Sequence, residues 1–336
     1  MTVLVYEDFG TGRHREASLI RHALGSAHDE ELIAGLAGGI GFMYFVFEYA
    51  GRAPIATIVA QAHPEPWVQV ALRRLHIPYD ATRATKPRWG RVRAALDGGQ
   101  PAFCVVDRSS LPWHAADADA DTEAEMIGAD PYTVVIAGYD GHDLLIEDGA
   151  DAPYRIDREE FGKAWTAHRK GRHQLIVPTG PPEGEPDVDG AIAATVTRMT
   201  GPVLGSHFDV NFGFTGMEKL AAQLRDQTTR TGWERRFGGS AELFRAGTGR
   251  LYACLEEEWT APGATRPLYA DFLDLAGRAE AASLLRESAG HWSALAALAR
   301  TAEPDSDAGR RRALFDECAE LVDLSLALER RAVALL

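Results

Sequence analysis

The chain has 336 residues, an apolar fraction of 46%, a charged fraction of 25% and a formal net charge of −14. This length is enough for two domains that each bury a core, and the composition is ordinary for a globular protein. The negative charge argues against nucleic acid as a general partner, and no apolar run approaches the roughly 18 residues of a membrane span.

The first residues, Met-Thr-Val-Leu-Val-Tyr, predict a strand, because no basic region precedes the apolar ones as in a signal peptide. We therefore expect a cytoplasmic protein. The three cysteines are far apart and lack metal-ligand spacing. Cys104 lies in a buried-strand pattern and Cys318 in an amphipathic helix, so both are predicted to be packing residues. No motif indicates a cofactor, so we expect none.

Residues 13–48 carry the most informative pattern. A polar cluster, Arg13 to Glu16, begins a helix with apolar residues at positions 17, 20, 23 and 24. A second short helix, capped by Asp29, leads to a glycine-rich stretch at 35–42 and an aromatic run that includes Tyr44. Charge at a helix start is a common way to build a site, although a helix cap and a surface turn give the same spacing.

Glu48 follows five almost wholly apolar residues. A carboxylate in that place is either buried, with a raised pKa suited to a base, or exposed at the end of a strand.

Residues 52–107 predict a strand at 52–62, a helix at 66–75, a helix at 89–96 and a buried strand at 101–107. The same part is locally basic. We expect it to be a candidate docking surface for an acidic partner, although a solvated helix face with ion pairs gives the same pattern. The basic residues that could serve this purpose are Arg83, Lys86, Arg88, Arg91 and Arg93.

Residues 115–130 are acidic, with Asp117, Asp119 and Asp121 at alternate positions. Such carboxylates could hold a hard cation, but the central glycine and terminal glutamate of a calcium loop are missing. We predict a surface loop and no metal site.

A strand at 132–139, the turn Asp140-Gly141 and a return strand at 143–147 predict a hairpin that ends at Asp148. A helix follows at 155–165, with Asp157 as its cap, and then a strand at 174–177. Residues 178–190 have the composition of a linker, and the chain beyond is mostly helical. Asn211, in a glycine-flanked loop, either reaches a cleft of the first domain or caps a turn.

These residues resemble the butirosin biosynthesis protein H family. The family pattern is a His-Cys pair, a helix and a glycine-rich run ending in Phe-x-Tyr, which His14 and the stretch 35–44 match. Further similarity lies in the glycine-flanked run at 211–216, in Gly232-Trp233 and in the Arg266-x-x-Tyr269 motif. The resemblance implies an α+β, papain-like N-terminal domain with an antiparallel sheet at 1–178, a linker at 179–190 and a mainly α-helical domain at 191–336.

The family implies aminoacyl transfer from an acyl carrier protein to an amine, through a cysteine nucleophile and a histidine partner. Here the cysteine position holds Arg15, and the histidine position, counted back from Gly138, holds Tyr132. Asp148 keeps the aspartate position. A guanidinium is permanently protonated and cannot attack an acyl group, so the sequence departs from thiol chemistry.

Polar residues are costly to bury without partners or purpose, which favours a retooled site over a decayed one. We predict Arg15, Tyr132, Asp148 and Glu48 as catalytic residues. Residues predicted to bind substrate are His14, Glu16, Tyr44 and Asn211.

The leading hypothesis is an enzyme of specialised metabolism that closes a ring on a carrier-bound amino-acid derivative. Aziridine formation with loss of an anionic leaving group is one example. The first alternative is aminoacyl transfer by direct attack of an amine on a thioester. The second is a non-catalytic carrier-binding or scaffold subunit.

Overall fold

The computed structural model describes residues 2–62, 66–114, 131–304 and 307–336. These residues pack as two compact units. The first comprises Met1–Ile33 and Trp67–Pro186, and the second comprises Ala34–Pro66 and Asp187–Leu336.

In the described part of the first unit, seven strands form one antiparallel sheet in the order β4-β9-β5-β6-β7-β8, with β1 also paired to β6. The buried-strand and hairpin predictions for this region are confirmed. The strands are β1 (Thr2–Leu4), β4 (Tyr79–Thr82), β5 (Ala102–Val106), β6 (Tyr132–Asp140), β7 (Asp143–Glu147), β8 (Tyr154–Asp157) and β9 (Leu175–Pro178).

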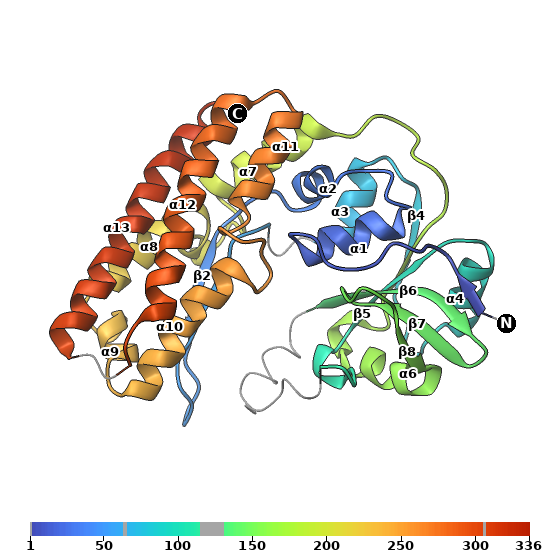
Figure 1. The fold of residues 1–336 in the computed structure, drawn as a ribbon, viewed down its shortest axis with the longest axis horizontal. Helices are drawn as coiled ribbons and strands as arrows, with labels where there is room; N and C mark the ends of the chain where they lie inside the picture. The colour runs from blue at the N-terminus through green and yellow to red at the C-terminus, as the bar shows by residue number, and fades with distance from the viewer. Residues whose placement is uncertain (1, 63–65, 115–130, 305–306) are drawn as a thin grey trace. The chain divides into compact units, whose positions relative to one another are not determined.

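Helices cover both faces of this sheet. Figure 1 shows α1 (Arg15–Ala23) and α3 (Trp67–Arg74) on one face and α6 (Arg158–Ala167) on the other. Asp157 caps α6 as predicted, since its carboxylate accepts hydrogen bonds from the amides of Glu159 and Glu160 at 2.7 and 3.3 Å. The remaining helical elements are α4 (Trp89–Asp97) and two 3₁₀ turns, η1 (Arg108–Ser110) and η3 (Arg169–Gly171).

The β6–β7 hairpin positions the predicted site. Asp140 pairs with Asp143 around the turn, so the start of β6 and the end of β7 lie at the same end of the hairpin. Tyr132 is the first residue of β6, and Asp148 directly follows β7. Helix α1 packs on β6, which brings the first residue of that helix, Arg15, to the same place.

The second unit is mainly helical. A two-stranded hairpin, β2 (Met43–Phe47) and β3 (Ile55–Val59), packs on two of its helices, and its buried Tyr44 and Ile58 join a core that contains Trp233 and Trp292. The helices are α7 (Val188–Thr200), η4 (His207–Asn211), α8 (Gly213–Arg225), α9 (Trp233–Phe237), α10 (Ala241–Glu256), α11 (Arg266–Leu275), α12 (Ala279–Thr301) and α13 (Ala308–Val333). Helix α2 (Glu30–Ala37) contributes residues to both units.

The expected fold class, an α+β part with an antiparallel sheet followed by a mainly helical part, is confirmed. The packing units differ from the expected division at 178–191, because Ala34–Pro66 belongs to the helical unit. Among the helices of the described ranges, none has the length and hydropathy that a membrane span requires.

Candidate functional site

His14 is the N-cap of α1. Its Nδ1 accepts a hydrogen bond from the amide of Ala17 at 3.3 Å, and its own amide donates to the carboxylate of Glu30 at 2.7 Å. The ring is fully buried and stacks on Trp67, with a centroid distance of 4.3 Å and an interplanar angle of 1°. His14 therefore fixes the start of the helix, and a role for it in binding substrate stays a prediction.

Arg15, in the family's cysteine position, makes a buried ion pair. Its Nη2 donates to Oδ1 of Asp148 and, at 2.7 Å, to the carbonyl of Thr133. Its Nη1 lies 3.4 Å from a carboxylate oxygen of the buried Glu16, and its guanidinium carbon lies 4.0 Å from the centre of the Tyr132 ring. The two residues predicted to replace the thiol and the histidine are thus in direct contact.

Asp148 accepts from four side chains. Besides Arg15, the Tyr132 hydroxyl donates to Oδ1 at 2.8 Å and Trp113 Nε1 donates to Oδ2 at 2.6 Å. His114 Nε2 lies 2.8 Å from the same Oδ2. Burial alone would raise the pKa of Asp148, but the charge of Arg15 and the hydrogen-bond donors lower it to about 2. The carboxylate is therefore ionised at every physiological pH.

Tyr132 is a neutral phenol in this cluster. Burial raises the pKa of its hydroxyl, and the cation of Arg15 only partly opposes that shift. The hydroxyl also lies 3.2 Å from His114 Nε2. Tyr132 can therefore donate a hydrogen bond but does not supply an anion.

The cluster formed by Arg15, Trp113, His114, Tyr132 and Asp148 is named here the Asp148 cluster. Sequence reasoning did not identify Trp113 and His114. A tryptophan–histidine pair between a buried strand and an acidic segment was the available signal. The family's histidine position holds Tyr132, but the imidazole of His114 lies beside both Tyr132 and Asp148. Histidine is the side chain that most readily takes up and releases protons near neutral pH.

Three predicted site residues lie in the second unit: Tyr44, Glu48 and Asn211. Tyr44 is buried, and its hydroxyl donates to Gln223 at 2.8 Å and accepts from Trp233 at 2.9 Å. Asn211 donates to the carbonyl of Phe208 at 2.8 Å. Its Oδ1 accepts from Lys219, so its amide is satisfied inside the second unit.

Of the two alternatives for Glu48, the buried base is wrong. Its side chain is 43% exposed and pairs with Arg236 at 2.7 Å. The apolar run before it is strand β2, whose burial decreases along its length until Glu48 lies past the end of the strand. The exposed alternative for this carboxylate therefore holds.

The cysteines are buried in both units. Burial raises the pKa of the Cys104 thiol well above its usual range and that of Cys318 to about 12. Neither is a thiolate at neutral pH. The acidic residues Asp117, Asp119 and Asp121 lie outside the described residues, and within the described ones no group of three or more metal-ligand side chains gathers.

Two sequence families match the chain. "Butirosin biosynthesis protein H, N-terminal" matches residues 14–149, and "Domain of unknown function (DUF4872)" matches residues 160–336. A search of curated proteins found no match. A solved structure described as a C39-like peptidase from Bacillus anthracis aligns with a TM-score of 0.36 and 16% identity, over 55% of this chain and 100% of that one. The DUF4872 model covers more than half of the chain, so the chain belongs to that family, and the two matches in this order give it a butirosin biosynthesis protein H-like architecture.

Proposed function

We propose that this chain takes part in butirosin-related antibiotic biosynthesis and acts on a carrier-protein-bound amino-acid derivative without a covalent thiol intermediate. The match of residues 14–149 to the butirosin biosynthesis protein H family supports the biosynthetic role. One observation carries the rest: the nucleophile position holds a guanidinium paired to an ionised carboxylate, with an imidazole and a phenol on the same carboxylate. These groups hold charge and move protons, and none is a sulfur nucleophile.

The reaction that best suits these groups is intramolecular ring closure. The substrate's ammonium group first gives a proton to His114, which Asp148 orients through their 2.8 Å contact. The amine nitrogen then attacks the neighbouring carbon, a C–N bond forms, and a C–O bond breaks. The electron pair of the broken bond leaves with an anion such as sulfate or phosphate.

Arg15 is proposed to stabilise the departing anion. Its Nε is buried and has no hydrogen-bond partner among the described residues, although its other nitrogens are engaged. A buried, unpaired donor on a cation is costly, and an anionic group would remove that cost. Interactions that strengthen as charge develops on a leaving group lower the barrier to its departure.

A second candidate is a non-catalytic carrier-binding subunit. The observation that favours it is the saturation of Asp148 by four donors, with the Arg15 side chain only 20% exposed. A buried carboxylate whose oxygens are all engaged can stabilise a fold without any reaction.

The intact mass of a loaded carrier protein separates these possibilities. Ring closure lowers the mass on the carrier by that of the departing acid. Aminoacyl transfer returns the carrier to its unloaded mass, and a non-catalytic subunit leaves the mass unchanged. The proposal fails if loaded carriers with sulfate or phosphate leaving groups keep their mass.

A further inference from the structure

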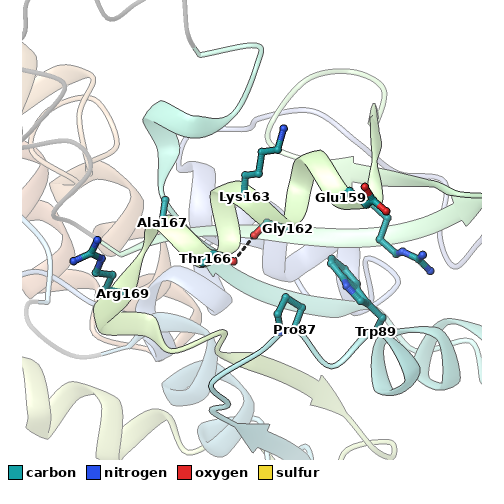
Figure 2. Close-up of a pocket in the computed structure, with 9 residues that line it drawn as sticks. Pro87, Trp89, Glu159, Gly162, Lys163, Thr166, Ala167 and Arg169 are labelled. Atoms are coloured by element: carbon teal, nitrogen blue, oxygen red, sulfur yellow. Dashed lines mark hydrogen bonds between the residues drawn. The ribbon is translucent and has the colours of Figure 1, made fainter.

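A cavity of about 600 Å³ lies in the first unit, and no residue of the Asp148 cluster lines it. Figure 2 shows Pro87 and Trp89 on one side of it and the helix α6 residues Thr166 and Ala167 on the other. We call it the α6 groove. Its charged lining residues are Arg158, Glu159, Lys163 and Arg169.

The cations of the α6 groove exceed its single carboxylate. Within the ranges that the structure describes, Arg158, Lys163 and Arg169 make no ion pair, and the guanidinium carbon of Arg158 lies 6.0 Å from the centre of the Trp89 ring. In a chain of net charge −14, this is a local excess of positive charge.

The basic segment predicted from the sequence is less available than this groove. Arg91 pairs with Asp80 at 2.6 Å, and Arg93 lies 3.6 Å from Asp97. Lys86 and Arg88, which flank the lining residue Pro87, make no ion pair in the described part of the chain. The free positive charge therefore runs from Lys86 and Arg88 across the groove to α6, rather than along the basic segment alone.

The exposure of these side chains favours a protein over a small molecule. Lys163 and Arg169 are exposed, and Trp89 is half-buried. Small-molecule sites usually enclose most of their ligand in an apolar cavity with few polar groups. Tryptophan and arginine at an open, charged surface are instead typical anchors of protein interfaces, where charge steers the partner.

We infer that the α6 groove is the docking surface for an acidic protein partner, with carboxylates of the partner against Lys163 and Arg169 and an apolar side chain against Trp89. This inference rests on the proposed function for the identity of the partner, a carrier protein. It differs from the sequence prediction in assigning α6 as half of the surface.

The test measures binding separately from chemistry. The probe is a type II acyl carrier protein in its apo form, which lacks the phosphopantetheine arm and so reports surface docking. Titration calorimetry with the full chain gives the dissociation constant at several salt concentrations. The variant Lys163→Glu/Arg169→Glu reverses two groove charges, and Arg245→Glu/Arg331→Glu makes the same charge change at exposed positions of the second unit.

We expect the groove variant to weaken binding by about tenfold or more and to flatten its salt dependence, with the control close to wild type. Trp89→Ala should also weaken binding, with no change in net charge. Equal binding by wild type and the groove variant would overturn the inference, as would no binding to wild type. So would tight binding of inorganic pyrophosphate that displaces the carrier, because that would identify a small-anion site.

The docking surface and the proposed reaction can fail independently. Loss of carrier binding in the groove variant supports docking even if the carrier mass never changes. A change in carrier mass supports the reaction even if the groove variant binds normally.

Discussion

Arg15 and Asp148 depend on one another because both are largely withdrawn from water. The Asp148 side chain is fully buried, and that of Arg15 is 20% exposed. Breaking a buried ion pair leaves an uncompensated charge, which costs more than the pair itself contributes. We expect Arg15→Met to lower the free energy of unfolding of the first unit by about 3 kcal/mol. Hydrogen exchange of β6 amides under increasing urea measures this change.

Two controls define that prediction. Arg15→Lys keeps the positive charge, so its free energy of unfolding should fall by less than that of Arg15→Met. The double variant Arg15→Met/Asp148→Asn removes both charges, so it should be more stable than the sum of the single changes predicts. Strict additivity of the two single changes would mean that the ion pair has no energetic role.

Asp148 also makes the stability of the folded chain depend on pH in the acid range. Its pKa is lowered from 3.8 to about 2 in the folded chain, so the unfolded chain binds more protons between these values. The stability from ionised Asp148 is therefore fully present above about pH 4 and is lost as the pH falls toward 2. The expected loss is roughly 2 kcal/mol. Urea unfolding at several pH values between 2.5 and 6 gives the free energy of unfolding as a function of pH. This free energy should change less steeply with pH in Asp148→Asn than in wild type, and equal pH dependence would contradict the prediction.

His114 is predicted to be the proton acceptor of the ring closure. His114→Gln keeps a polar side chain near Asp148 but cannot take up a proton near neutral pH. We expect the rate of the carrier mass change to fall by about a hundredfold, because the variant has no side chain at this place that can accept the proton. Carrier binding should remain unchanged. A wild-type rate in this variant would exclude the role.

The meeting of Arg15, Tyr132 and Asp148 was predicted from the family resemblance, because these residues hold the family's cysteine, histidine and aspartate positions. The hairpin register alone places only Tyr132 and Asp148 at the same end. The sequence did not predict Trp113 and His114, because they come from a segment without helical or strand periodicity. It left both a buried and an exposed alternative open for Glu48, because five consecutive apolar residues do not reveal where a strand leaves the core.

At the scale of elements, the glycine-rich stretch serves close packing. A Cβ on Gly35 of α2 would lie 2.1 Å from the ring of Phe272 in α11, and one on Gly41 would lie 2.6 Å from the backbone carbonyl oxygen of Gln61. Gly35 therefore lets α2 pack against α11, and Gly41 lets the chain before β2 approach the chain that follows β3. The sequence predicted the short helix and a strand at 52–62, but neither the pairing of β2 with β3 nor the core that these elements join.

Gly35→Ala is predicted to destabilise the second unit by about 1–3 kcal/mol, because the ring of Phe272 cannot yield without disturbing the core. Gly290→Ala in α12 is the matched control, since a Cβ there meets no atom within 4 Å. That change should stabilise the helix by roughly 0.5–1 kcal/mol. Thermal unfolding followed by circular dichroism measures both, and a neutral effect of Gly35→Ala would contradict the packing argument.

At the scale of the whole molecule, the linker does not separate two independent pieces of chain. Residues 178–190 have linker composition, but Ala34–Pro66 lies before them and packs with the helices that follow them. The Nη1 of Arg266 donates to the carbonyl of Ala60 at 2.8 Å, and Trp233 donates to Tyr44 at 2.9 Å, both inside the second unit. Composition therefore indicates where the chain can be cleaved, but long-range packing determines whether the two fragments separate after cleavage.

A protease site inserted between Glu183 and Gly184 tests this organisation. After cleavage, we expect the two fragments to elute together on native gel filtration, because the buried Tyr44 and Ile58 keep the first fragment in the core of the second unit. Each such buried side chain contributes about 1.5–3 kcal/mol. The fragments should separate in urea, and the fragment from residue 184 onward, expressed alone, should unfold without a sharp transition because it lacks β2 and β3. Separation of the cleaved fragments in native buffer, or cooperative unfolding of the isolated C-terminal fragment, would show that the helical part is complete without the hairpin.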